Sequence, residues 1–344
     1  MRVSRKHYHP SGACAIDEPM LVLSETDVKK LIDIPELIES LEAAHIRLST
    51  GKAVMPVRLV VPLPQIHGRI TSMPAYLGEA NALGMKVVTY FEQNPKRGLP
   101  AILATIMLYD TETGKIGAIM DGSTITAIRT ACASAMATKA LANTETAVVG
   151  ILGAGVQARA HILALCQVRK ITTIKIYSPS GNSARKLKEE IEPQVNVKIE
   201  PVESAEKAAR DVDLLVTVTT AKEPILEARW LKPGVHINAV GSHRPDLREI
   251  DGETLKRAKI FVDSREAIMV ECGDVLLAIK EGAIAADHIA GEIGEVLAGT
   301  KPGRSTPNEI TLYKSVGVAI QDVATAQLVY RKALEQSAGH EVPI

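Results

Sequence analysis

The chain has 344 residues, of which 46% are hydrophobic, so it is long enough to form two domains with apolar cores. Lys and Arg together number 40, as do Asp and Glu, which leaves no net charge to attract nucleic acid or a membrane surface. Aromatic residues make up only 3% of the chain, too few for base stacking, and no apolar run approaches the roughly 20 residues of a membrane span.

The N-terminal segment, residues 1–19, has no apolar core and is therefore no secretory signal. We expect a flexible tail, or one that a partner orders, in a cytoplasmic protein. The cysteines lack metal-site spacing, which favours small buried thiols in a reducing compartment and predicts no metal site. They are Cys14, Cys132, Cys166 and Cys272.

The first predicted elements are a strand at 20–23 and two helices at 25–32 and 35–49. Ser24 is a typical N-cap for the first helix, and Gly51 ends the second. The second helix is amphipathic, because its leucines recur on one face.

Residues 54–120 consist of short β-like runs separated by Pro, Gly and Asn, and the segment 110–114 (DTETG) is typical of a hairpin turn. We expect an antiparallel or mixed sheet here. A long helix of small residues at 123–141 follows and joins two domains. The expected strands are 57–61, 69–73, 84–90, 101–110 and 115–120.

From residue 146 onward strands and helices alternate, which predicts a doubly wound parallel sheet with its ligand site at the carboxyl edge. The last segment, 309–335, is predicted to be helical and able to pack back on the N-terminal domain. The expected strands are 146–152, 172–178, 197–202, 213–219, 235–241 and 259–263. The expected helices are 155–168, 182–191, 204–210, 227–231 and 251–257.

A glycine motif follows the first of these strands. Gly153 permits a tight turn, Gly155 lets the backbone approach a pyrophosphate, and the small Ala158 lets helix and strand pack closely. The helix N-terminus then faces an anion. A tight turn without a ligand is the alternative, but the order strand, turn, helix favours dinucleotide binding. The expected cofactor contacts here are Gly153, Ala154, Gly155, Val156 and Gln157.

The second strand ends at Ser178, where a carboxylate normally binds the adenosine ribose. The residues that follow include Ser180, Arg185 and Lys186. Because hydroxyl groups and cations suit a 2′-phosphate, this segment favours NADP(H) over NAD(H). A surface turn with an ordinary cap is the alternative. The other expected cofactor contacts are Thr130, Thr217, Val218, Thr219, Val240 and Gly241.

Three cations stand out on the substrate side: Arg58, Lys86 within an apolar strand, and Arg129 within the small-residue helix. A buried charge is costly unless it meets an anion. Singly, each is more often a surface side chain or a structural ion pair. Together, converging on one cleft, they would suit a carboxylate substrate, which Arg binds bidentately.

From about residue 20 to 330 the chain resembles the ornithine cyclodeaminase/mu-crystallin family. The matching segments are PVRLVVP, MPAY, KVVTYF, MDGSTITAIRTACASA, GILGAGVQA, VTVTTAKEPIL, HINAVGSHRPDLREID, VDS, GDVLL, GEIGEVLAG and YKSVGVAIQD. The resemblance implies a homodimer with a discontinuous α+β substrate-binding and dimerisation domain (20–124 and 315–344) and a Rossmann domain (125–314). It also implies that Arg58, Lys86 and Arg129 hold the substrate carboxylate.

The resemblance also bears on the reaction. Cyclodeaminases carry an Asp after the fifth strand, whereas this chain has His243 there, within GSHRPD, and so looks more like mu-crystallin, a ketimine reductase. His243 is a candidate for proton transfer or substrate contact, or a polar lid residue. Asp246 is interpreted as a helix-capping or ion-pairing residue.

The predicted reaction is hydride transfer between nicotinamide C4 and the α carbon of an imino acid, with the carboxylate clamped by the three cations. Lys86 is the expected proton donor or water ligand, since burial beside two arginines should depress its pKa. Met55, Met73 and Tyr76 are expected to line the substrate pocket, and Met73 to contact the substrate.

Three alternatives remain open. The chain could catalyse reductive amination like an alanine dehydrogenase, or redox-neutral ornithine cyclodeamination, which releases ammonia without net NADH. From another class, mu-crystallin also suggests a protein that binds NADPH and a small ligand without turnover.

Overall fold

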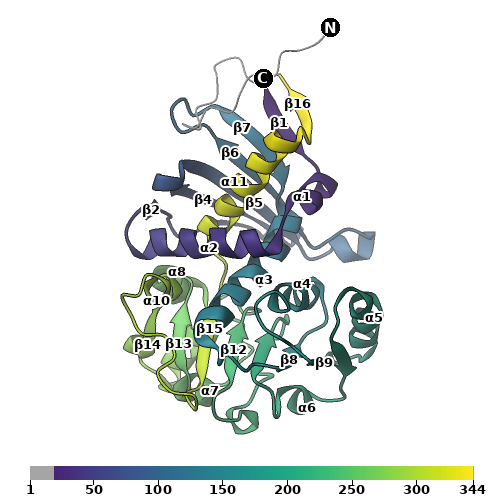
Figure 1. Ribbon diagram of the computed structural model, residues 1–344, viewed down its shortest axis with the longest axis vertical. Helices are drawn as coiled ribbons and strands as arrows, with labels where there is room; N and C mark the ends of the chain where they lie inside the picture. The colour runs from purple at the N-terminus through teal and green to yellow at the C-terminus, as the bar shows by residue number, and fades with distance from the viewer. Residues whose placement is uncertain (1–18, 344) are drawn as a thin grey trace. The chain divides into compact units, whose positions relative to one another are not determined.

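The computed structural model describes residues 19–343 and divides into two compact units (Figure 1). The first unit comprises the described residues up to Ile32, Gly51–Thr126 and the segment from Asp322 onward; the second comprises Asp33–Thr50 and Ala127–Gln321. Two unit boundaries fall inside helices, α3 (Gly122–Leu141) and α11 (Ala319–Gln336). The predicted tail, apart from residue 19, lies outside the described residues.

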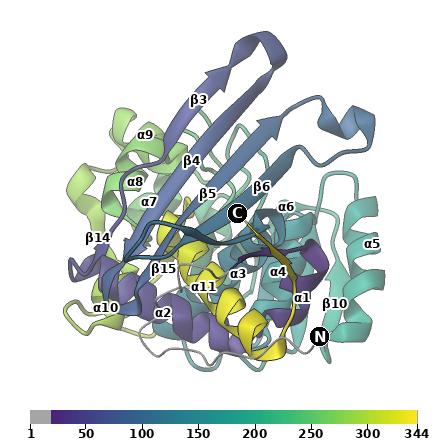
Figure 2. The ribbon, with the colours of Figure 1, turned by 90° about the horizontal axis from the view of Figure 1, so that it is seen from above.

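The first unit contains a mixed eight-stranded sheet, as predicted. The strand order is β16-β1-β7-β6-β5-β4-β2, with β3 paired to β4, and β1 and β7 run parallel while the other neighbours are antiparallel. Figure 2 shows β3, β4, β5 and β6 side by side. The strands are β1 (Met20–Leu23), β2 (Ala53–Val54), β3 (Leu59–Leu63), β4 (Gly68–Leu77), β5 (Ala82–Phe91), β6 (Ile102–Tyr109), β7 (Ile116–Asp121) and β16 (His340–Val342).

Local sequence accounts for the ends of these elements. Ser24 caps α1 (Glu25–Leu31) through a reciprocal capping box with Asp27, as expected for an N-cap serine. The hairpin turn at 110–114 is confirmed, because the Asp110 carboxylate accepts the backbone N–H of Thr113 at 2.8 Å. Short 3₁₀ turns occupy η1 (Pro64–Ile66), η2 (Gly78–Ala80) and η3 (Asn94–Arg97).

One face of this sheet is covered by α11. Met73 and Leu77 on β4 are buried, while Ile70 and Tyr76, which point to the other face, are exposed. Val323 of α11 lies against Gly84 of β5, where a Cβ would come within 3.1 Å of the valine side chain. The core of the first unit therefore lies between the sheet and α11.

The second unit contains the predicted doubly wound sheet, and all eight strands are parallel. The order β10-β9-β8-β11-β12-β15-β13-β14 places later strands on both sides of β8, so the switch point lies between β8 and β11. The strands are β8 (Val148–Leu152), β9 (Thr173–Tyr177), β10 (Lys198–Pro201), β11 (Leu214–Thr217), β12 (His236–Ala239), β13 (Lys259–Val262), β14 (Ile289–Glu292) and β15 (Thr311–Lys314).

The second unit also contains helices. Besides the unit's share of α3 they are α2 (Ile34–Ser49), α4 (Val156–Leu165), α5 (Asn182–Ile191), α6 (Ala205–Ala209), α7 (Gly252–Arg257), α8 (Arg265–Glu271), α9 (Gly273–Lys280) and α10 (Ile293–Leu297). Short 3₁₀ turns form η4 (Glu192–Gln194), η5 (Ala228–Trp230) and η6 (Ala286–His288). Gly150 is required on β8, since a Cβ there would lie 2.1 Å from the backbone oxygen of Ala208 on α6.

Two predictions of secondary structure were wrong. The segment 309–335 is not helical throughout: Thr311–Lys314 form the fully buried strand β15 between β12 and β13, and α11 begins only at Ala319. The four residues TLYK are too few to show a periodicity that separates a strand from a helix. The expected helix at 227–231 is only the single 3₁₀ turn η5, and Pro233 follows it closely.

Helix α2 belongs to the second unit, whereas the expected substrate domain included it. Its Ser49 hydroxyl donates to Glu292, the N-cap residue of α10, at 2.7 Å. Gly294 on α10 lies so close that a Cβ would meet the His45 backbone oxygen at 2.1 Å. The small residue allows the two helices to make close contact.

Candidate functional site

The glycine turn has the geometry of a dinucleotide-binding loop. Gly153 has φ +117°, and a Cβ there would lie 2.6 Å from the Val218 backbone oxygen, so only glycine fits. Gly155 is the N-cap of α4, which has no side-chain cap in the described part of the chain. Val156 is 70% exposed, and Gln157 Oε1 is buried without a hydrogen-bond partner within residues 19–343. The open N–H groups suit a pyrophosphate.

The turn after β9 carries hydroxyls and a cation, as the sequence predicts. The Ser178 hydroxyl accepts the backbone N–H of Ala184, in the first turn of α5, at 3.3 Å, while Gly181 is the N-cap of that helix. Ser180 and Arg185 are exposed, and the Arg185 guanidinium donates to Asn182 Oδ1 at 2.5 Å. Lys186 is also exposed.

Glu249, a buried carboxylate that was not predicted from the sequence, joins the carboxyl ends of β11 and β12. Its Oε1 accepts the Thr219 N–H at 2.5 Å, and its Oε2 accepts the Gly241 N–H at 2.8 Å and the Thr217 hydroxyl at 2.8 Å. Thr217 is fully buried, so its hydroxyl serves this carboxylate. A Cβ on Gly241 would lie 2.4 Å from Glu249 Oε1, which requires glycine here. Val218 and Val240, at the same strand ends, are half-buried.

Glu249 is part of a buried charge network. Asp274 accepts the backbone N–H of Glu249 at 2.7 Å and forms an ion pair with Lys314, at the end of β15, at 2.9 Å. Burial raises the pKa of the Glu249 carboxyl, and the Asp274 carboxylate raises it further. Burial opposes the charge on Lys314, but the Asp274 carboxylate outweighs it and raises the pKa of this lysine. The network ties together the ends of three strands at the ligand edge of the sheet.

The loop after β12 exposes His243, whose Nδ1 lies 3.1 Å from the Gly241 carbonyl oxygen. Asp246 accepts two hydrogen bonds from the Arg244 guanidinium, at 2.6 and 2.9 Å, which confirms its interpretation as an ion-pairing residue. The Arg244 guanidinium also holds the pKa of the Asp246 carboxyl below its usual range.

In the first unit, Lys86 lies on β5 and is only 2% exposed. It is paired in register with the buried Met73 on β4, so the two side chains share one face of the sheet. Its Nζ lies 2.8 Å from Asp322 Oδ2 on α11. The prediction for Lys86 named two arginines as its neighbours and did not include this carboxylate.

Arg58 is half-buried between β2 and β3, as is Met55, and Tyr76 is exposed on β4. These residues, like Lys86 and Met73, belong to the first unit.

In the second unit, Arg129 lies on α3 and is 3% exposed, and its neighbour Thr130 is buried as well. The Arg129 Nη1 donates to Gln321 Oε1 at 2.5 Å, and Gln321 Nε2 lies 3.0 Å from His45 Nε2. Burial, and secondarily Arg129, lower the pKa of His45 to about 3, so this histidine is neutral. Gly317 has φ +74° and a Cβ there would meet the Arg129 guanidinium at 2.6 Å.

Gln321 and Asp322 could have been suspected from one signal. Both are polar residues inside an otherwise apolar pattern, and a buried polar group must find a partner, whereas Glu249 lies in the charged segment DLREID and carries no such signal. The sequence does not say which partner that is.

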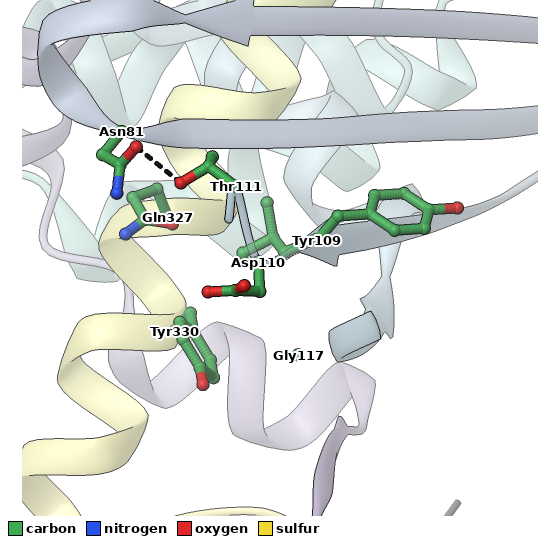
Figure 3. Close-up of a pocket in the computed structure, with 8 residues that line it drawn as sticks. Asn81, Tyr109, Asp110, Thr111, Gly117, Gln327 and Tyr330 are labelled. Carbon is green, nitrogen blue, oxygen red and sulfur yellow. Dashed lines mark hydrogen bonds between the residues drawn. The ribbon is translucent and has the colours of Figure 1, made fainter. Parts of the chain in front are cut away.

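A small pocket in the first unit lies between the hairpin turn and α11 (Figure 3). The Thr111 hydroxyl donates to Asn81 Oδ1 at 2.6 Å beside it, and Asp110, Gln327 and Tyr330 also line it. None of the residues predicted for the functional site lines this pocket.

Among residues 19–343, no group of His, Cys, Asp and Glu side chains could hold a metal ion. The described helices include none that is long and apolar enough to cross a membrane. Burial raises the thiol pKa of Cys132 and Cys272 to about 12 and that of Cys166 to about 11, so these thiols are unreactive, while Cys14 lies outside the described residues.

A doubly wound parallel sheet, with a glycine turn and an open helix N-terminus at its switch point, defines a dinucleotide-binding protein of the Rossmann type. The chain belongs to the ornithine cyclodeaminase/mu-crystallin family, whose model matches residues 18–337.

Several relatives are similar over most of the chain. The ketimine reductase mu-crystallin of Rattus norvegicus is 41% identical over 297 residues, which cover 86% of this chain and 91% of the relative. The structure of Thermococcus litoralis Δ1-pyrroline-2-carboxylate reductase in complex with NADH and L-proline is 45% identical, with a TM-score of 0.92, and the match covers 94% of this chain and 100% of the other. An archaeal alanine dehydrogenase dimer with bound NAD is 36% identical, with a TM-score of 0.90 and coverage of 94% and 99%.

Proposed function

We propose that the chain is an NAD(P)H-dependent reductase that reduces the C=N bond of a carboxylate-bearing imino acid. The main observation in support of the proposal is the N-terminus of α4, which directly follows Gly153 and Gly155 and has no side-chain cap. Its open N–H groups fit the pyrophosphate of a nicotinamide cofactor. The names of the relatives supply the class of substrate: a ketimine reductase and a pyrroline-2-carboxylate reductase.

The cofactor would be held by the second unit. In this proposal the segment Gly153 to Gln157 binds the pyrophosphate, and Thr130, Val218, Thr219, Val240 and Gly241 form the nicotinamide side. Thr217 contributes through its backbone, because its hydroxyl already donates to Glu249. When bound, the nicotinamide supplies the hydride.

The substrate carboxylate would be bound by Arg58, Lys86 and Arg129, in keeping with the burial of the last two. Positive charge near the substrate also keeps the attacked carbon electron-poor. Lys86 Nζ, held by Asp322, is the proposed source of the proton that the reduced nitrogen takes up, either directly or through a water. Met73 and His243 are proposed as further substrate contacts.

We also propose a preference for NADP(H). The residue that follows β9 is Ser178 and not a carboxylate, which would repel a 2′-phosphate. The turn after it and the start of α5 expose Ser180, Arg185 and Lys186. The pyrroline-2-carboxylate reductase and alanine dehydrogenase structures hold NADH and NAD, so the preference needs a direct test. We expect kcat/KM to be higher with NADPH than with NADH. Arg185→Ala should lower kcat/KM for NADPH and leave that for NADH unchanged; equal losses with both coenzymes would contradict the proposal.

A homodimer is the proposed assembly. The first unit exposes apolar side chains on several strands of its sheet, among them Leu59 and Val60 on β3 and Ile102 on β6, and exposed apolar patches mark contact surfaces. The related archaeal alanine dehydrogenase is a dimer. Val60→Asp should shift the sedimentation coefficient toward the monomer, whereas Leu334→Asp, at an exposed apolar residue on α11, should not. The cytoplasmic location remains a prediction.

Reductive amination is a second candidate, because the alanine dehydrogenase is also similar over nearly the whole chain. Coenzyme oxidation separates the activities. Oxidation of NADPH by Δ1-pyrroline-2-carboxylate supports the reductase, and oxidation by pyruvate with ammonia supports the dehydrogenase. Ammonia release from ornithine without net NADH would support cyclodeamination. Tight coenzyme binding without turnover in any assay would support a binding protein.

A further inference from the structure

Two consecutive residues in the first turn of α11 contact two buried cations. Gln321 Oε1 accepts from Arg129 Nη1 at 2.5 Å, and Asp322 Oδ2 lies 2.8 Å from Lys86 Nζ. Gln321 and Asp322 are themselves fully buried. A buried side chain with defined partners has few alternative rotamers, so each contact fixes the orientation of its cation.

The Gln321 amide is itself fixed. The Arg129 guanidinium can only donate, so the amide oxygen faces it. The amide nitrogen then lies 3.0 Å from Nε2 of His45 and donates to it, which the neutral imidazole can accept. A neutral amide orients the guanidinium without adding a negative charge that would compete with an anionic ligand.

Unlike the neutral Gln321 amide, Asp322 contributes a carboxylate, which compensates the charge of the Lys86 ammonium. An ion pair in a protein interior adds little net stability, since the desolvation of both charges offsets their attraction. Its presence is therefore better explained by the need to hold the ammonium in one place than by a contribution to folding.

We propose that Gln321 and Asp322 are positioning residues for substrate binding: Gln321 orients Arg129 through its neutral amide, and Asp322 orients Lys86. The inference rests on the proposed function, in which these two cations bind the substrate carboxylate. Neither positioning residue needs to touch the substrate.

The test is steady-state kinetics of the full-length enzyme with Δ1-pyrroline-2-carboxylate and NADPH. Gln321→Leu should raise KM for the imino acid by about tenfold or more, as expected when a hydrogen bond to a charged group is removed, with KM for NADPH within about twofold of wild type. Gln327→Leu is the matched control, since Gln327 lies on the same helix beside the small pocket of Figure 3 and should leave both KM values unchanged.

Asp322→Asn should likewise raise KM for the imino acid, and Asp322→Glu, which retains the charge, should recover part of the affinity. If Asp322→Asn does not fold, Asp322→Glu alone decides: one added methylene displaces the Lys86 ammonium, so KM for the imino acid must exceed that of wild type. A lower melting temperature, with both KM for the imino acid and kcat unchanged, would show a merely structural role and overturn the inference.

Arg129→Met and Lys86→Met, measured alongside, separate carboxylate binding from positioning. If these variants leave KM for the imino acid unchanged, the proposed carboxylate binding is wrong. If they raise it while Gln321→Leu and Asp322→Asn do not, carboxylate binding stands and the inference about α11 fails.

Discussion

Replacement of Glu249 by glutamine tests whether this buried carboxylate holds the ends of β11 and β12. The substitution preserves shape but replaces one oxygen by an NH₂ group. The two backbone donors bind different oxygens, Thr219 N–H on Oε1 and Gly241 N–H on Oε2. Whichever way the amide turns, one backbone N–H faces another donor.

The expected magnitude follows from the hydrogen bonds that the substitution breaks. A hydrogen bond to a charged acceptor contributes about 1.5–3 kcal/mol, and a buried donor left unsatisfied costs about 1–3 kcal/mol. We therefore expect Glu249→Gln to lower the free energy of unfolding by about 3 kcal/mol. With an unfolding entropy of about 2.1 cal/mol/K per residue, about 3 kcal/mol in a chain of 344 residues corresponds to a fall in Tm of roughly 4 °C. KM for the coenzyme should rise as well, because Thr219 and Gly241 are proposed cofactor contacts.

Asp213→Asn is the matched control at the opposite end of β11. Both backbone donors, Ala147 N–H and Val148 N–H, bind the same oxygen of Asp213, so the amide oxygen of Asn can keep both. Lys232, which binds the other oxygen, is partly exposed and can turn to solvent. Urea and thermal unfolding should show a much smaller decrease in stability for this variant. Equal stability of Glu249→Gln and wild type would show that the carboxylate does not hold the two strand ends.

Two further predictions concern the second unit. Gly155→Ala should leave the free energy of unfolding unchanged, since no described atom lies within 4 Å of the added Cβ, but it should raise the Kd for NADPH in a fluorescence titration. Gly153→Ala, in contrast, should destabilise the fold, because its Cβ would meet the Val218 backbone oxygen. Burial lowers the pKa values of His45 and His236 to about 3 and that of His161 to about 4. In the unfolded chain these histidines have the ordinary pKa of about 6.5, so below that pH they are protonated in the unfolded state but still neutral in the folded one. Their contribution to stability is therefore complete above that pH and is lost as pH falls, by about 1.4 kcal/mol for each histidine between pH 7.5 and 5.5, measured by urea unfolding.

Each of these predictions has an outcome that contradicts it. A Gly155→Ala variant with unchanged NADPH affinity would place the coenzyme away from this turn. An unfolding free energy with the same pH dependence in wild type and in His161→Gln would show that this histidine titrates alike in both states.

Features set by neighbouring residues were predictable from the sequence. The glycine turn, the Ser24 cap and the 110–114 hairpin were located correctly because their signals lie within a few residues. The α/β class and the family followed from the alternation of elements and from long motifs, and both are confirmed.

Features set by distant residues were not predictable. Strand β15 follows β13 and β14 in the chain but pairs with β12 and β13, and its four residues TLYK carry no pattern that predicts this position. The partner of Lys86 lies far along the chain, at Asp322 on α11. A cation in an apolar strand could be recognised as unusual, but its counterion could not be named. Glu249 lies in the charged segment DLREID, which gives no signal of burial, and its backbone partners, Thr219 and Gly241, follow two different strands.

In the proposed reaction, a nicotinamide bound at the glycine turn reduces the C=N bond of an imino acid. The most direct measurement is the reduction of Δ1-pyrroline-2-carboxylate with NADPH that carries deuterium at both C4 positions, followed by mass spectrometry of the product. We expect coenzyme oxidation and proline that carries one deuterium on its α carbon. Proline without deuterium, or no oxidation of NADPH or NADH by any carboxylate-bearing imine, would contradict this reaction.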